Sequence, residues 1–212
     1  QRADGTGEVQ RLTESTRPQY ADSWHPSGRF LAFRQENLQT GDDLMILPME
    51  GDEASGWKPG TPTIFLNRPA SEVDPMFSPD GRWMAYVSNE SGRSEVYVRP
   101  FPGPGGKWQV STAGGSYPMW SAQAHELFYL RQGKVFVASY APTADSFAVA
   151  QPRVWSENAP NLRSLGELMP DGKHVVAALP TSADTAAEPQ LPHVTFLLNF
   201  VDELRRRSAE GK

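Results

Sequence analysis

Four carboxylate side chains lie just ahead of three strongly apolar positions in this chain, where they could act together in chemistry. The candidate metal ligands are Asp22, Glu72, Asp74 and Glu167. Oxygen ligands of this kind suit Ca²⁺, Mg²⁺ or Mn²⁺, and Zn²⁺ also accepts carboxylates. If the four side chains converge, their mutual repulsion raises a pKa or attracts a divalent cation. The same positions also suit carboxylates that hydrogen-bond turn backbone or face solvent.

His25 and Tyr117 are the candidate catalytic side chains beside this carboxylate set. Either could serve as acid, base or orienting group for a water molecule activated by a metal that acts as a Lewis acid. That chemistry predicts hydrolysis of small esters, phosphotriesters or lactones. The sequence contains no Gly-x-Ser-x-Gly motif and no cysteine, which excludes a thiolate metal site, a cysteine nucleophile and a disulfide.

An internal repeat determines which elements must position these residues. The segment FSPDGRWMAYVS, which begins at Phe77, has counterparts in WHPSGRFLAF from Trp24, WSAQAHELFYL from Trp120 and LMPDGKHVVAA from Leu168. The opening apolar residues recur at intervals of roughly 43 to 53 residues, the length of a β-propeller blade. Pro presets φ and Gly accepts a positive φ in the turn, so each unit predicts a β-hairpin. Large aromatic residues at repeated positions predict packing between units.

Further strands follow each hairpin. Third strands are predicted at 43–49, 95–101, 134–140 and 193–200, and outer strands at 63–66, 108–111 and 153–155. The last unit lacks an outer strand, and Glu8–Thr13 could supply it, within the chain or from a neighbour. We therefore expect a single all-β domain over 1–212. Its parts are blade units at 14–67, 68–112, 113–157 and 158–202, a closing strand at 8–13 and a charged tail at 203–212.

The stretch from Phe77 to Pro102 resembles the TolB-like and tricorn-like β-propeller repeats, and the resemblance extends over nearly the whole chain. It is most similar to the arrays at the C-terminal end of many bacterial serine/threonine kinases, although the chain has no kinase glycine-rich loop or Asp-Phe-Gly segment. The third and first turns, SAQAH and HPSG, depart from the Ser-Pro-Asp-Gly pattern of the family. The resemblance implies a propeller, partial or half, with its functional surface at the channel mouth.

Composition limits the partners. The formal net charge is −5 and the 20 Lys and Arg residues are scattered, so nucleic-acid binding is not expected. No apolar run is long enough for a membrane helix, and the sequence does not distinguish a cytoplasmic from a periplasmic protein. We expect a self-associating partial β-propeller that acts as a binding or interaction module, as a homo-oligomer or with a protein or peptide partner. The alternative is the metal-dependent hydrolase with a small-molecule ester as substrate.

Overall fold

The computed structural model describes residues 8–52, 56–143, 146–157, 164–169, 171–172 and 174–178. The chain divides into two compact units, one of residues 1–12 with 181–212 and the other of residues 13–180. In the first unit only residues 8–12 are described, and they contain no strand. All the strands named below belong to the second unit.

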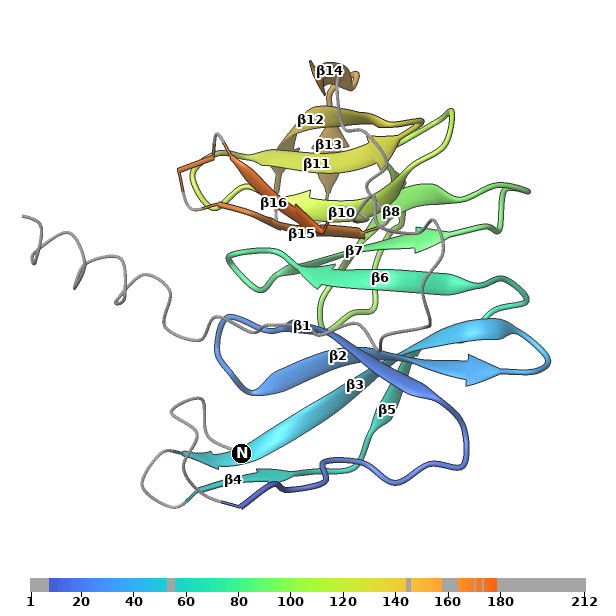
Figure 1. The fold of residues 1–212 in the computed structure, drawn as a ribbon, viewed down its shortest axis with the longest axis vertical. Helices are drawn as coiled ribbons and strands as arrows, with labels where there is room; N and C mark the ends of the chain where they lie inside the picture. Colours follow the sequence, from blue (N-terminus) through green and yellow to red (C-terminus); the bar gives the residue numbers. More distant parts are fainter. Residues whose placement is uncertain are drawn as a thin grey trace, which may run out of the picture. The chain divides into compact units, whose positions relative to one another are not determined.

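The described residues of this second unit form four antiparallel sheets (Figure 1). The first sheet contains β1 (Gln19–Trp24), β2 (Phe30–Asn37), β3 (Gly41–Asp52), β4 (Gly56–Pro59) and β5 (Thr63–Leu66). The second sheet contains β6 (Glu72–Phe77), β7 (Trp83–Ser88), β8 (Glu95–Pro100) and β9 (Trp108–Gln109). The third contains β10 (Ser116–Trp120), β11 (Glu126–Arg131), β12 (Lys134–Pro142), β13 (Phe147–Val149) and β14 (Arg153–Ser156). The fourth contains β15 (Ser164–Leu168) and β16 (Val175–Ala178).

Strand order follows the chain, which is the arrangement of a propeller blade. β1, β6, β10 and β15 each begin a sheet and lie next to one another along the series, and we call them the inner strands (Figure 1). The all-β fold predicted from the repeat is therefore confirmed. β5, β9 and β14 lie where the sequence predicts outer strands.

Two strands, β4 and β13, were not predicted from the sequence. β3 and β12 run beyond the body of their sheets, and their far halves pair with β4 and β13 respectively. Their near halves pair with the outer strands β5 and β14. Each long third strand thus has two antiparallel partners in addition to the second strand of its hairpin, so the first and third sheets have five strands while the second has four.

Apolar side chains fill the seams between neighbouring sheets. Ala32 and Ile46 of the first sheet pack with Phe77 and Met84 of the second. The seam between the second and third sheets is larger, and its buried members are Trp83, Ala85, Val87, Val96, Val98, Val110, Trp120, Leu127, Tyr129, Ala138 and Phe147. Since each sheet buries one face against its neighbour, the repeat acquires its core by stacking.

The described residues before β1 contain no strand, so the structure does not show the strand predicted at Glu8–Thr13. The predicted partner strand at 193–200 and the charged tail lie outside the described residues. Closure of the series, within one chain or between two chains, stays a prediction.

Candidate functional site

A β-bulge interrupts every inner strand. The register shifts between Ala21 and Ser23 in β1, Val73 and Met76 in β6, Ser116 and Met119 in β10, and Leu165 and Glu167 in β15. Asp74 and Tyr117 lie in these bulges with φ of 53° and 51°, a left-handed conformation that is uncommon for residues other than glycine. Bulges re-aim side chains and are enriched next to functional sites, so this part of the inner strands is the first place to look for one.

The bulges bring Asp22 and Asp74 to one guanidinium group. Arg34 Nε lies 3.6 Å from Asp22 Oδ1, and Arg34 Nη1 lies 3.9 Å from Asp74 Oδ1. The Tyr117 backbone N–H donates to Asp74 Oδ2 at 3.3 Å. The Arg34 guanidinium also stacks over the Tyr20 ring, 5.0 Å from its centroid. Asp22, Asp74 and the backbone of Tyr117 therefore belong to one cluster around Arg34.

Burial dominates the electrostatics of this cluster. It raises the pKa of Asp22 from 3.8 to about 6, although the Arg34 charge acts in the opposite direction. Burial also raises the pKa of Asp74, again partly offset by Arg34. Asp22 Oδ2 and Arg34 Nε are buried atoms without a hydrogen-bond partner among the described residues. At 3.6 Å, Arg34 Nε and Asp22 Oδ1 are close enough for Coulomb attraction but too far apart for a hydrogen bond.

Glu72 does not join this cluster. Its side chain is 1% exposed, and its charge interacts with Asp43, Arg68 and Arg99. Burial, together with the Asp43 charge, raises the pKa of Glu72 to about 7. In a regular strand Glu72 and Asp74 would share a face, but the bulge after Val73 separates their surroundings.

The described residues contain no group of three or more His, Cys, Asp or Glu side chains placed to hold a metal ion. Glu167 belongs to β15 by its backbone, and its side chain lies outside the description. Between Asp22 and Asp74 the chain supplies its own cation, Arg34, which is not among the residues predicted from the sequence. Its signal in the sequence is a charged residue directly after the apolar run Phe30–Phe33 of β2.

His25 lies at the other end of β1, in the hairpin turn. The Ser27 backbone N–H donates to His25 Nδ1 at 3.1 Å, and His25 Nε2 lies 3.1 Å from the Gly81 carbonyl oxygen. These contacts fit one neutral tautomer, with the proton on Nε2. The imidazole ring packs against the rings of Phe30, Phe77 and Phe101 at centroid distances of 5.0 to 5.5 Å. His25 thus joins the first two sheets, and both of its nitrogens are occupied.

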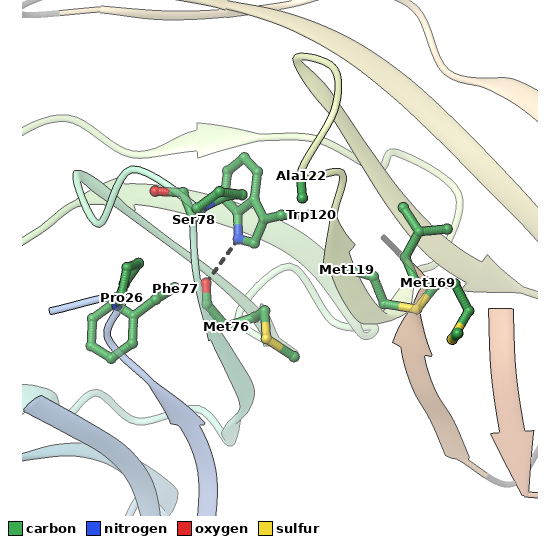
Figure 2. A pocket seen from close by; sticks show the side chains of 10 residues that line it. Pro26, Met76, Phe77, Ser78, Met119, Trp120, Ala122 and Met169 are labelled. Carbon is green, nitrogen blue, oxygen red and sulfur yellow. Dashed lines mark hydrogen bonds between the residues drawn. The ribbon is translucent and has the colours of Figure 1, made fainter. Parts of the chain in front are cut away.

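A pocket of about 270 Å³ opens beside the ends of the inner strands (Figure 2). All four sheets contribute to its lining, which consists of Pro26, Met76, Phe77, Ser78, Pro79, Met119, Trp120, Ala122, Leu168 and Met169. The Trp120 indole N–H donates to the Met76 carbonyl oxygen at 2.9 Å, as the dashed line in Figure 2 shows. The Ser78 hydroxyl donates to Asp80 Oδ1 at 2.6 Å. The polar side chains of the lining are therefore engaged, and the wall that remains is apolar.

Sequence reasoning did not find this pocket. The predicted site residues ionise or bind metals, whereas most of the lining residues are methionine, proline or aromatic. The available signal was the pair Met76 and Met119, which precede the opening aromatic residue in the second and third units. Methionine adapts to ligands of varied shape because its chain is unbranched and polarisable.

Comparison with known proteins agrees with the fold. No protein-family model matches the chain. The tricorn protease homolog 1 of Streptomyces coelicolor is 32% identical over 92 residues, which are 43% of this chain and 7% of that protein. A TolB-type structure from Agrobacterium tumefaciens matches with a TM-score of 0.50 and 19% identity over 80% of this chain and 61% of its own. TolB from Acinetobacter baumannii matches with a TM-score of 0.34 and 14% identity, over 69% of this chain and 47% of its own.

The chain spans less than two thirds of the length of each of these proteins. A helix both long and apolar enough to cross a membrane does not occur in the described part of the chain. The similarity to solved structures concerns the fold, and the repeat resemblance seen in the sequence is confirmed by both kinds of comparison. The chain therefore folds as an array of β-propeller blades, similar to those of the TolB-type structure from Agrobacterium tumefaciens.

Proposed function

We propose that the chain is a binding module that receives an apolar side chain of a protein or peptide partner in the pocket between Met76, Met119 and Met169. The observation that carries this proposal is the pocket itself, to which every sheet contributes. The polar side chains of its lining already form hydrogen bonds within the protein, so the pocket favours binding of an apolar group over a polar one. Flexible methionine side chains suit partners whose side chains differ in shape.

Selection of binding peptides tests the proposal. A displayed library of random peptides is panned on the purified chain, and the selected peptides are measured by calorimetry. We expect enrichment of large apolar side chains. Ala122 is an exposed turn residue that lines the pocket, so Ala122→Trp should fill the mouth and weaken binding by about tenfold or more.

Gln123→Trp is the matched control, because Gln123 is the exposed neighbour of Ala122 in the same turn and is not part of the lining. It should bind the selected peptides within about twofold of the wild type. Peptides that lack apolar side chains, or that bind the Ala122→Trp variant as well as the wild type, would locate the binding surface elsewhere.

Self-association is a second candidate, favoured by one observation. Trp24 is 52% exposed, whereas its counterparts Phe77, Trp120 and Leu168 are 5%, 7% and 8% exposed. Each counterpart packs against the preceding sheet. A blade from a second copy of the chain could cover Trp24 in the same manner.

Sedimentation equilibrium over a range of protein concentrations tests this candidate. If self-association uses Trp24, Trp24→Arg should yield a monomer under conditions where the wild type is larger. Trp57→Arg is the matched control, since Trp57 is a 37% exposed tryptophan on β4. A monomeric wild type at all concentrations would remove the candidate.

The metal-dependent hydrolase has less support. Arg34 occupies the position between Asp22 and Asp74 where a cation would be required, and Glu72 faces a different set of charges. Adding Ca²⁺, Mg²⁺, Mn²⁺ or Zn²⁺ singly after treatment with a chelator should therefore leave the melting temperature unchanged. A rise of several degrees that disappears in Asp74→Asn would revive the hydrolase.

A further inference from the structure

Glu72 is a buried acid that the proposed binding site does not use. It is the first residue of β6, pairs in register with Ser88 of β7, and is 1% exposed. Its Oε2 atom is buried and has no hydrogen-bond partner among the described residues. Burying an ionised carboxylate whose oxygen has no hydrogen-bond donor costs much desolvation free energy, whereas burying the protonated, neutral carboxyl group costs much less.

A second carboxylate acts on Glu72 from the first sheet. Asp43 of β3 accepts hydrogen bonds from Asn37 Nδ2 at 2.7 Å, Thr40 Oγ1 at 2.7 Å and Asn67 Nδ2 at 3.3 Å. These three donors stabilise negative charge on Asp43. Of the two neighbouring acids, Asp43 is therefore the one equipped to hold charge, and Glu72 is the one equipped to hold a proton.

Cationic groups also surround Glu72 but have other partners. The remaining charged or titratable groups that act around Glu72 are Arg68, Tyr86, Arg99 and Lys107. Arg68 Nη1 lies 3.7 Å from Glu90 Oε2, and Lys107 forms an ion pair with the same carboxylate. Arg99 Nε donates to the Tyr86 hydroxyl at 3.3 Å. Within the described residues, none of these cations forms an ion pair with Glu72.

The seam around Glu72 joins two sheets. Tyr86 and Tyr97 of the second sheet pack with Leu44 and Leu66 of the first, and the two tyrosine rings stack at 5.8 Å. Since Asp43 and Glu72 come from opposite sides of this seam, a negative charge on both would push the first and second sheets apart.

We propose that Glu72 is a proton-dependent latch between the first and second sheets: it is neutral when the sheets are packed, and its ionisation loosens their contact. The device would make the stability of this seam respond to pH near neutrality. It does not depend on the binding function proposed above.

The direction of the pKa agrees with the geometry. Burial, together with the Asp43 charge, raises the pKa of Glu72 from 4.5 to about 7, while the Arg68 backbone and the Arg68 and Arg99 charges act in the opposite direction. The folded protein therefore holds this proton at pH values where the unfolded chain releases it. The stabilisation is present below about pH 5, falls as the pH rises through 7, and is lost above that.

Carbon-detected NMR titration of the full chain, labelled at glutamate carboxyl groups, tests the latch directly. We expect one resonance with a midpoint near pH 7 that is missing from Glu72→Gln. Hydrogen exchange, corrected for its intrinsic pH dependence, should show faster opening of β6 and residues 67–71 at pH 8 than at pH 5.5. If every glutamate titrates at its ordinary pKa, the proposal is overturned, and this reading needs no variant to fold.

Variants supply the second test. The melting temperature of the wild type should fall by several degrees between pH 5 and pH 8, and Glu72→Gln should reduce that fall. Glu126→Gln, a change at a more accessible acid paired with Arg153, should leave the wild-type pH dependence intact. Equal pH dependence in wild type and Glu72→Gln would contradict the proposal.

Discussion

Trp24 and Trp120 occupy the same position of the repeat, yet their surroundings differ completely. Trp120 is 7% exposed, donates its indole N–H to the Met76 carbonyl oxygen, and contacts the rings of Tyr140 and Phe147 at 5.1 and 5.9 Å. Trp24 is 52% exposed and makes no ring contact within the described residues. The difference lies in the preceding sheet, which covers Trp120 and has no equivalent over Trp24 among the described residues. A repeat sequence therefore specifies a face for packing without specifying whether that face is covered.

The largest effect should come from truncating the two tryptophans. Trp120→Ala should lower the free energy of unfolding by about 3–5 kcal/mol, because it removes a large buried side chain from the seam between the second and third sheets. Trp24→Ala should cost less than about 1 kcal/mol, as exposed positions usually do. Urea denaturation at low protein concentration measures both. If Trp24→Ala is as costly as Trp120→Ala, Trp24 is covered in solution and the contrast between the two ends fails.

The hairpin glycines give a second, smaller test of the same contrast. Gly28 and Gly81 have φ of 70° and 71°, so alanine meets similar left-handed strain at both positions. Among the described residues, an added Cβ at Gly28 would have no neighbour within 4 Å, whereas at Gly81 it would lie 2.2 Å from Nε2 of His25 in the preceding sheet. We expect losses of about 1 kcal/mol for Gly28→Ala and about 2–3 kcal/mol for Gly81→Ala.

Thermal or urea denaturation of both glycine variants is compared in wild-type and His25→Ala backgrounds. Removing the imidazole should bring the cost of Gly81→Ala down towards that of Gly28→Ala, since the clash partner is gone. Equal costs of the two changes in the wild-type background would mean that the turn of the second sheet does not pack on His25.

Much of the fold follows from the sequence because each unit repeats the same signals. The apolar residue, the turn and the alternating third strand recur, so a unit with a weak signal can still be aligned with the others. The third turn illustrates this: it lacks the Gly of its counterparts and the Asp of the second and fourth turns. The Ser121 hydroxyl nevertheless accepts hydrogen bonds from the backbone N–H groups of Gln123 and Ala124 and stabilises the turn. β4 and β13 were not predicted because, among the described residues, such a strand occurs in the first and third units and has no counterpart in the second.

The candidate site was less predictable, and for a physical reason. That Asp22 and Asp74 lie near each other follows from adjacent inner strands, which the repeat implies. The separation of Glu72 from Asp74 depends on a bulge, and a one-residue irregularity changes which side chains share a face. Arg34 and the methionine pocket were missed because neither is a metal ligand or a nucleophile, the two kinds of group for which the sequence was searched.

The smallest expected effect distinguishes the two bulge aspartates. Asp74 interacts with Arg34 from the preceding sheet and accepts the Tyr117 backbone N–H from the following one, whereas Asp22 retains an unpartnered Oδ2 atom. Burial raises the pKa of Asp22 from 3.8 to about 6, so ionisation of Asp22 makes the folded state less stable as the pH rises through this interval.

Asp22→Asn cannot ionise and should therefore stabilise the protein at pH 8 while giving no such gain at pH 4. We expect about 1 kcal/mol at pH 8, less than the pKa alone implies, because the Arg34 charge loses one of its two partners. Urea denaturation at the two pH values measures the difference. A loss of stability at pH 8 that disappears at pH 4 would mean that attraction between Asp22 and Arg34 outweighs the cost of burial. In that case the first sheet would hold its bulge carboxylate as firmly as the second sheet does, and the contrast would be confined to Trp24 and the hairpin turn.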